Sequence, residues 1–239
     1  MAQQKEFNMH CDDFALFRSA TNEIKVISKE ISKIIQKKLI RSFLDIGAGS
    51  GELTNILVKN LKIQKAIAID KNRLFNKKIS NIRFFQRDWL SFAPHRKYDF
   101  ILSSHSTAYL AEKNIAKTIK KMYKFLNPGG KAVIIVYDDQ GSWPIFKKLF
   151  YPKRQKMSTL DRIKSIIKNK YTFDEKSFLT KIYANNLEHM LQIGRFLAEK
   201  HLSCYLGKAV EAKKFFAKYK ADNGKIIFPL NHKMIILKK

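Results

Sequence analysis

Apolar and polar residues follow two different periods along this chain. Five short, mainly apolar runs have the length and composition of strands that are buried on both faces. They cover residues 42–46, 65–70, 82–86, 98–103 and 131–137. Amphipathic stretches with a period of 3.6 residues lie between them and predict helices at 52–61 and 112–126, with a short helix after residue 70. The alternation indicates an α/β fold with helices on both faces of a mostly parallel sheet.

The flanking segments are more mixed. Isoleucines from residue 24 to residue 35 form one helical stripe, and Asn22 stands where it can cap this helix. The stretch Asn127-Pro128-Gly129-Gly130 predicts a turn that stops the preceding helix. Helices are also predicted at 143–150, 158–168, 187–201 and 207–218, a strand at 176–184, and a terminal hairpin-like pair of strands at 225–228 and 233–237.

The segment FLDIGAGSGE, residues 43–52, carries the most chemical information. Gly47, Gly49 and Gly51 alternate after the first predicted strand, so the backbone can turn tightly and approach a ligand closely. Asp45 precedes the turn and Glu52 opens the next helix. Two carboxylates would repel a pyrophosphate but attract a ligand that has a sulfonium and an ammonium group. The pattern therefore favours S-adenosylmethionine over NAD.

Acidic residues follow the next two predicted strands. In an open parallel sheet, ligands bind at the carboxyl ends of the strands. Asp70 ends the second strand, and an acid at this place accepts hydrogen bonds from ribose hydroxyls; the alternative is a helix cap. Asp88 and Trp89 follow the third strand, where a carboxylate can accept from an adenine amino group and a ring can pack on the base. For Trp89 alone, core packing is the alternative.

The ordered set FLDIGAGSGE, AIAID, RDWLSF, YDFILSSHS and FLNPGGKAVIIV resembles the class I S-adenosylmethionine-dependent methyltransferase family, over residues 40–140. The resemblance implies a Rossmann-like sheet of seven strands in the order 3-2-1-4-5-7-6, with the last strand antiparallel, helices on both faces and an added helical cap. It also implies a set of cofactor-binding residues. They are Asp45, Gly47, Ala48, Gly49, Gly51, Asp70, Lys71, Asp88, Trp89, Ser104 and His105.

On this basis we expect one methyltransferase domain over residues 1–239. Its expected parts are N-terminal lid helices at 1–38, a cofactor-binding core at 39–140, a largely helical substrate-covering segment with one strand at 141–220, and a terminal strand pair at 221–239.

The stretch after the fourth strand, Ser103 to Tyr109, bears on the methyl acceptor. It has neither the Asn/Asp-Pro-Pro-Tyr motif nor the Asn-Leu-Pro-Tyr motif of related enzymes that methylate nucleic acid bases. It is similar instead to small-molecule enzymes of the histamine N-methyltransferase type. His105 stands where those enzymes place a substrate-contacting Gln, and Tyr109 matches a second aromatic residue, so both are predicted catalytic residues.

An imidazole that titrates near neutral pH suits a general base, so His105 is the candidate base. The alternative is that it only hydrogen-bonds the substrate or fills the wall of the site. The predicted substrate-binding residues are His10, Phe14, Phe17, Thr21, Tyr137 and Trp143. For those near the N-terminus, plain packing of a helix is the alternative. The lid also departs from the similar group, because Thr21 falls where that group has a Glu that holds an amine.

The net charge of +27 leaves the partner open. Basic surfaces commonly bind nucleic acid or anionic membranes, yet only nine of the 47 basic residues are Arg, and the Lys residues are spread along the whole chain. We favour a compositional bias, and therefore transfer of a methyl group to an N or O nucleophile of a small molecule. RNA or protein as the acceptor, and a cofactor-binding scaffold without catalysis, are the alternatives.

Cellular location and metal content follow from what the sequence lacks. Cys11 and Cys204 have no metal-ligand spacing, so we expect free thiols and no metal. The sequence contains neither a membrane-spanning apolar run nor a signal core, so we expect a soluble, cytoplasmic protein.

Overall fold

A computed structural model describes residues 12–35, 39–72, 80–150, 157–198 and 201–239. The chain divides into two compact units. The sheet unit consists of Ile24–Tyr137, Met157–Phe178 and His232–Lys239, and the helical unit consists of the described residues of Met1–Glu23, Asp138–Lys156 and Leu179–Asn231.

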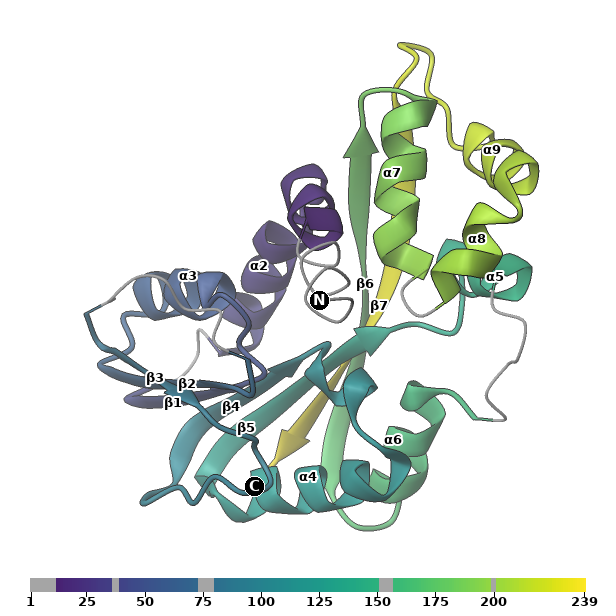
Figure 1. The fold of residues 1–239 in the computed structure, drawn as a ribbon. Helices are drawn as coiled ribbons and strands as arrows, with labels where there is room; N and C mark the ends of the chain where they lie inside the picture. Colours follow the sequence, from purple (N-terminus) through teal and green to yellow (C-terminus); the bar gives the residue numbers. More distant parts are fainter. Residues whose placement is uncertain (1–11, 36–38, 73–79, 151–156, 199–200) are drawn as a thin grey trace, which may run out of the picture. The chain divides into compact units, whose positions relative to one another are not determined.

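Seven strands form one sheet in the order β3-β2-β1-β4-β5-β7-β6 (Figure 1). The pairs from β3 to β5 are parallel, and β7 runs antiparallel to β5, so the predicted strand order and the antiparallel strand are confirmed. The strands are β1 (Ser42–Ile46), β2 (Lys65–Asp70), β3 (Ile82–Gln86), β4 (Tyr98–Ser104), β5 (Leu126–Tyr137), β6 (Thr172–Ala184) and β7 (Ile226–Lys238).

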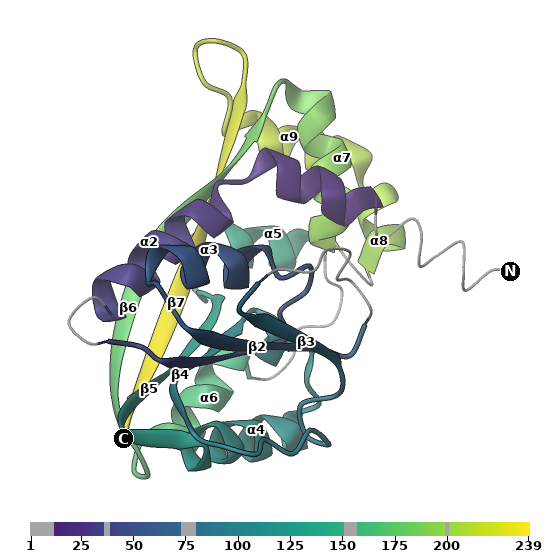
Figure 2. The same cartoon turned by 90° about the vertical axis from the view of Figure 1, so that its left-hand side faces the viewer.

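Two hydrophobic cores cover opposite faces of the sheet within the sheet unit. Side chains alternate between them along each strand, as a period of two requires: Phe43 faces one core and Leu44 the other. Apolar stripes of α2 (Glu23–Ile35) and α3 (Glu52–Asn60) enter the first core, whereas those of α4 (Glu112–Lys124) and α6 (Thr159–Ile167) enter the second. Figure 2 shows these two pairs of helices on opposite sides of the strands. The expectation of helices on both faces is confirmed.

The helical unit has an aromatic core of its own. It contains a helix over residues 12–20. Its other helices are α5 (Ser142–Phe150), α7 (Leu187–Ala198), α8 (Leu202–Leu206) and α9 (Ala209–Ala217). The buried ring of Phe146 lies 4.7–5.8 Å from the rings of Phe150, Phe215 and Phe216. Such large buried rings, at about 3–5 kcal/mol each, stabilise a unit built from short helices.

Several sequence-based element predictions were wrong. The terminal strand pair is a single strand, β7, which continues through Pro229, with alternate side chains buried from Ile226 to Met234. The predicted turn at Asn127–Gly130 lies inside β5. There the register slips, so that Tyr98 pairs with Leu126 and Phe100 with Lys131, and the intervening residues form a bulge.

Smaller differences concern single residues and helix ends. The Asn22 side chain does not cap α2 but accepts a hydrogen bond from the Lys181 backbone at 2.8 Å. The strand predicted at 176–184 begins earlier, at Thr172, and the helix predicted at 207–218 is α9, preceded by the separate short helix α8. Cys204 is a free thiol. His10, Cys11 and the short helix expected after residue 70 lie outside the described residues.

None of the helices in the described part of the chain combines the length and the apolar character needed to cross a membrane.

Candidate functional site

The glycine loop between β1 and α3 is the centre of the candidate site. Gly47, Gly49 and Gly51 all have positive φ angles, between 56° and 76°, which side chains of L-residues rarely tolerate. The amides of Gly47 and Ala48 donate to the Ile69 carbonyl at 2.8 and 3.0 Å, which ties the loop to the end of β2. The loop is therefore a fixed turn at the carboxyl ends of two parallel strands.

The two leading glycines of this loop have different surroundings. A Cβ added to Gly47 would lie 2.2 Å from the Cβ of Ser106, so this position has no room for a side chain. A Cβ added to Gly49 would meet no atom within 4 Å. Gly47 therefore permits close packing within the protein, whereas Gly49 presents its backbone to open space in which a ligand can approach.

Asp70 closes the loop from β2. One carboxylate oxygen accepts a hydrogen bond from the amide of Gly49 at 2.9 Å, and the other accepts from the amide of Asn72 at 2.9 Å. A carboxylate oxygen has a second lone pair, so these bonds leave acceptor capacity for a ligand. The bond from Asn72 is of the kind expected if Asp70 caps a helix, which was the alternative to ribose binding. Ribose binding by Asp70 remains a prediction.

Asp45 does not behave as the exposed anion that the sequence argument assumed. It is buried in β1 and accepts a hydrogen bond from the Thr54 hydroxyl of α3 at 2.6 Å. Burial raises its pKa to about 7, with a further increase from the negative charge of Asp70, and the Thr54 bond opposes this rise. Asp45 therefore links β1 to α3 and carries only part of a negative charge near neutral pH, whereas Glu52 is exposed.

The turn after β3 separates the two predicted adenine contacts. Asp88 is exposed, and its carboxylate accepts from the Leu90 amide at 2.7 Å. Trp89 is 5% exposed and lies in the second core, so its placement agrees with the core-packing alternative. Contact of either residue with a base remains a prediction.

Lys121 of α4 holds this turn, and sequence reasoning missed it. Its ammonium lies 4.5 Å from the centre of the Trp89 ring and donates to the carbonyls of Trp89 at 2.6 Å and Leu90 at 3.0 Å, and also to that of Phe92. Burial lowers the pKa of Lys121, and the charge of Asp88 opposes the shift. One Lys among many in an amphipathic helix gives no signal in the sequence.

A hydroxyl network joins the end of β4 to the glycine loop. The Ser106 hydroxyl donates to the Ile46 carbonyl at 2.7 Å and lies 2.7 Å from the Ser103 hydroxyl, which also pairs with Thr107 at 2.7 Å. Ser104, the last residue of β4, pairs in register with Ile135. The short 3-10 helix η1 (Ser106–Tyr109) follows. The network fixes the position at which His105 leaves the sheet.

His105 belongs to a cluster of rings in the sheet unit. Its φ is +57°, an unusual value for a residue other than Gly, and its amide donates to the Ile135 carbonyl at 2.9 Å. Its ring lies 4.4 Å from Tyr137 and 5.2 Å from His232. His232 also stacks on Phe178 at 4.9 Å. We call His105, Tyr137, Phe178 and His232 the ring cluster. It brings together two predicted residues and two that were missed.

His232 and Phe178 have only a weak signal in the sequence. Neither forms a spacing motif with His105, and both come from late strands. Alternate residues of β7 are buried from Ile226 to Met234, and His232 is one of them. Correct recognition of β7 as one strand would have marked His232 as an inward-facing polar residue.

Further predicted site residues lie in η1 and in the helical unit. Tyr109 is 65% exposed at the end of η1, and its catalytic role remains a prediction. Phe14, Phe17, Thr21 and Trp143 belong to the helical unit.

Within the helical unit, these residues have structural contacts. The rings of Phe14 and Phe17 lie 5.4 and 4.7 Å from that of Phe196 in α7, and Trp143 stacks on Phe146 at 5.4 Å. The Thr21 hydroxyl donates to the Lys181 carbonyl at 3.2 Å. These contacts agree with the packing alternative, and substrate binding by the four residues remains a prediction.

Two curated proteins resemble the chain over part of its length. Polyketide synthase 22 of Dictyostelium discoideum is 30% identical over 139 residues, which make up 47% of this chain and 5% of that protein. The malonyl-acyl-carrier-protein O-methyltransferase of Priestia megaterium is 24% identical over 162 residues, or 64% of this chain and 57% of the enzyme. The chain thus spans less than two thirds of the length of either relative.

A solved structure and a family model resemble the chain over a larger part of its length. The plantazolicin methyltransferase BpumL in complex with SAH superimposes with a TM-score of 0.54 and 16% identity, covering 100% of this chain and 91% of BpumL. The model of the methyltransferase domain matches residues 17–192, which include the glycine loop, Asp70 and His105. With the strand order of class I methyltransferases and a glycine loop at the expected strand ends, the chain belongs to the methyltransferase domain family.

Proposed function

We propose that the protein is an S-adenosylmethionine-dependent methyltransferase that transfers a methyl group to an N or O nucleophile of a small molecule. One observation carries the proposal: the glycine loop is closed onto the Asp70 carboxylate, and Gly49 faces open space beside it. Membership of the methyltransferase domain family and the likeness to BpumL, which was solved with SAH, support the choice of cofactor.

The residues present suit this cofactor. The loop from Gly47 to Gly51 would hold it through backbone groups, because Gly49 leaves space that a side chain would fill. Asp70 would accept hydrogen bonds from the ribose hydroxyls with its remaining lone pairs, and Asp88 would accept from the adenine amino group. Lys71, Ser104 and His105 complete the proposed cofactor site at the carboxyl ends of β2 and β4.

The cofactor supplies a methyl group on a positively charged sulfur, which is activated for displacement without help from the protein. The protein residues have to align the acceptor, exclude water and manage one proton. A neutral amine needs little base, whereas a hydroxyl nucleophile benefits from one. We assign proton acceptance to His105, because an imidazole is the usual general base near neutral pH and this residue directly follows the carboxyl end of β4.

Several features favour a small acceptor. The chain lacks the Pro-Tyr motifs of base-methylating relatives after β4, and aromatic rings surround His105 instead. BpumL is named for plantazolicin, and the Priestia relative for an O-methyl transfer to a carrier-bound malonyl group. As part of this proposal, Tyr137 contacts the acceptor. The lid role of residues 1–38, the covering role of residues 141–220, and acceptor contacts by Phe14, Phe17, Thr21 and Trp143 stay predictions from the sequence.

Isothermal titration calorimetry with S-adenosylmethionine tests the cofactor site. We expect binding by the wild-type protein and at least a tenfold weaker affinity in Asp70→Ala, because a charge-assisted hydrogen bond is worth about 1.5–3 kcal/mol. Asp222→Ala is the matched control, since it removes one exposed carboxylate from the helical unit. Absence of binding by the wild type, or equal affinities for both variants, would contradict the assignment.

Turnover tests the role of His105. Conversion of S-adenosylmethionine to SAH is followed with a panel of amines, phenols and alcohols as candidate acceptors. In His105→Ala we expect cofactor affinity to fall by less than in Asp70→Ala, and turnover with a hydroxyl acceptor to fall by about 10²–10⁴-fold, the usual contribution of a positioned base. Unchanged turnover would remove His105 from the mechanism.

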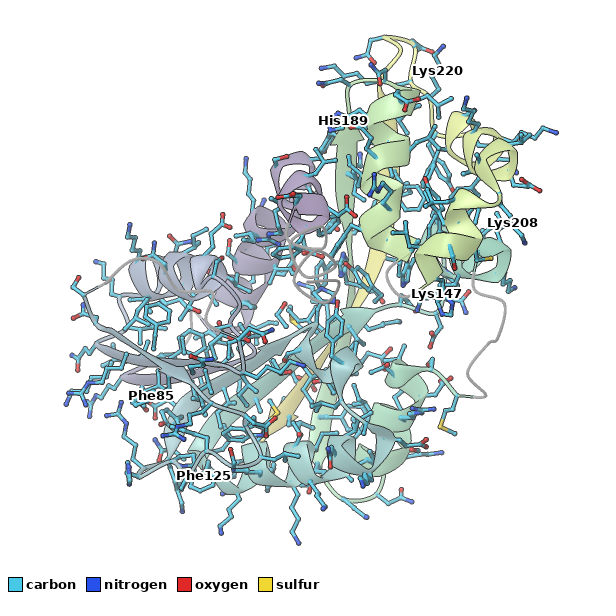
Figure 3. The ribbon with its side chains drawn as sticks, viewed as in Figure 1. Phe85, Phe125, Lys147, His189, Lys208 and Lys220 are labelled. Carbon is cyan, nitrogen blue, oxygen red and sulfur yellow. The ribbon has the colours of Figure 1, made fainter. Side chains whose placement is uncertain are left out.

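A macromolecular acceptor is the second candidate, and the net charge of +27 favours it. The exposed basic side chains include Lys147, Lys208 and Lys220 of the helical unit (Figure 3). If RNA is the acceptor, its binding constant should fall steeply with salt concentration, because each phosphate contact releases counterions. A flat salt dependence, together with turnover on a small acceptor, would favour the first proposal.

A further inference from the structure

The ring cluster has a buried member that the proposed mechanism does not use. His232 is completely buried in β7 and lies directly opposite Tyr137 of β5 in the antiparallel pair. Phe178 lies flat against it, with ring centres 4.9 Å apart and an angle of 7° between the planes. His105 meets it edge to face at 5.2 Å and 68°. Among the described residues, His232 is thus the one member of the cluster whose ring contacts the other three rings.

Burial of a histidine at this position carries a cost in free energy. A buried imidazole loses hydration that an apolar side chain of similar size would not need. Its neighbours at inward-facing positions of β7, Leu230 and Met234, are apolar. A volume-filling role alone would be served better by Leu, so the flat ring itself points to a function.

The ring of His105 needs external support. Its backbone is held by the hydrogen bond to Ile135, whereas its ring, whose two nitrogens are buried, is placed by the rings packed against it. Rotation about two side-chain bonds would move its ring nitrogens by several ångströms. Such a displacement matters, because loss of alignment by about 1 Å can lower a rate by about 10²-fold.

We propose that His232 is a positioning residue, whose buried ring fixes the orientation of His105 and Tyr137 at the carboxyl ends of β4 and β5. The ring touches both partners, and Phe178 supports it from the side through a flat stack. The importance of this orientation for methyl transfer rests on the proposed function, in which His105 accepts a proton.

The protonation state of His232 agrees with this role. Burial holds the pKa of His232 well below its ordinary value, and the nearby His105 lowers it further. His232 therefore stays neutral at neutral pH. A neutral ring can remain packed against His105 when His105 takes up a proton, whereas a second imidazolium would repel it.

A matched pair of variants tests the proposal. His232→Leu keeps roughly the volume and removes the ring, whereas His232→Phe keeps a flat ring. The readout is the NMR spectrum of the His105 ring in ¹³C-histidine-labelled protein, with and without SAH as the probe, and His105→Gln identifies the signals. The signals compared are the NOE cross-peaks between the His105 and Tyr137 rings, because loss of the ring at position 232 changes the ring-current shift of His105 even when His105 keeps its orientation. A change in stability alone would not alter these cross-peaks.

We expect His232→Leu to weaken the cross-peaks between the His105 and Tyr137 rings, and His232→Phe to leave them close to their wild-type intensities. If Leu and Phe change the signals equally, or if neither does, the proposal is overturned. Phe178→Leu provides a second route should a substitution at His232 prevent folding. It should weaken the His105–Tyr137 cross-peaks by a smaller amount, and unchanged cross-peaks would contradict the proposal.

The test of His232 and the test of the proposed function can fail independently. Calorimetry with S-adenosylmethionine on the same wild-type sample reports cofactor binding. If the protein does not bind the cofactor while Leu and Phe differ in the spectrum without SAH, the proposed function fails and His232 still positions His105. If the cofactor binds and the spectra do not differ, only the positioning role fails.

Discussion

Gly47 and Gly49 allow the structural and the ligand-binding roles of the glycine loop to be separated. Both have positive φ, +71° and +56°, so alanine is strained at either position. The added Cβ meets very different surroundings. At position 47 it would lie 2.2 Å from the Ser106 Cβ and 2.8 Å from its hydroxyl, whereas at position 49 it meets nothing within 4 Å.

The expected free energies follow from these contacts. Alanine in the left-handed region costs about 1–2 kcal/mol, which is the whole expected effect of Gly49→Ala on the free energy of unfolding. Gly47→Ala also displaces Ser106, whose hydroxyl donates to Ile46 and pairs with Ser103. With the overpacking and the weakened hydrogen bonds, its total cost is roughly 3–6 kcal/mol. The affinity for S-adenosylmethionine should not follow the stability, because in Gly49→Ala the added methyl group occupies space proposed for the cofactor.

Urea unfolding followed by circular dichroism measures stability, and calorimetry with S-adenosylmethionine measures affinity. Gly224→Ala is a suitable control, because Gly224 also has positive φ, +80°, and an added Cβ meets nothing within 4 Å. We expect Gly224→Ala and Gly49→Ala to lose similar stability, and only Gly49→Ala to lose affinity, by at least tenfold. Equal stability losses at positions 47 and 49 would refute the argument from Ser106. Equal affinities for the variants at 49 and 224 would refute the argument from open space.

Three further predictions concern pH and packing. Burial raises the pKa of Asp45 from 3.8 to about 7, so its protonated form stabilises the fold at low pH, and stability should fall by about 4 kcal/mol as the pH rises through that window. Urea unfolding across this pH range should show a shallower dependence in Asp45→Asn, and an unchanged slope would contradict the assignment. Lys121→Met leaves three carbonyls without their ammonium donor and should lower the free energy of unfolding in urea by about 2–3 kcal/mol. The control, Lys120→Met, changes an exposed side chain and should lower it little. Similar losses in both variants would show that Lys121 does not hold the turn after β3. Gly194→Ala should destabilise by about 1–3 kcal/mol although alanine favours helices, because the added Cβ would lie 2.2 Å from the Tyr205 hydroxyl oxygen. A higher melting temperature of this variant would show that Tyr205 moves aside without loss.

The core of the fold was predictable because its determinants are local. Residues 42–46 and 98–103 are mostly apolar, with only Asp45, Asp99 and two serines among them, so their composition predicts burial on both faces. The glycine loop was predictable for a similar reason, since positive φ at Gly47, Gly49 and Gly51 is a local requirement that few other residues meet. The order of the strands came from the resemblance to a family, and the pairing in the structure confirms it.

Predictions failed where distant residues decided the outcome. Residues 225–228 and 233–237 were predicted as two short strands, but pairing with neighbouring strands keeps β7 continuous. Asn127–Gly130 has the composition of a turn, yet pairing on either side carries it into β5 as a bulge. Asp45 was predicted as a charged group near the ligand, and its burial against Thr54 changes its charge.

The sequence by itself determined the parallel core, the position of the glycine loop and the acids at the strand ends, because these depend on neighbouring residues and on the backbone demands of single positions. Only the tertiary structure decided which side chains meet there. His105 and His232 are far apart in the chain, and their rings lie 5.2 Å apart because β7 returns antiparallel beside β5. Local propensity carries no information about such a pairing, because it arises from the register between strands that are remote in the sequence.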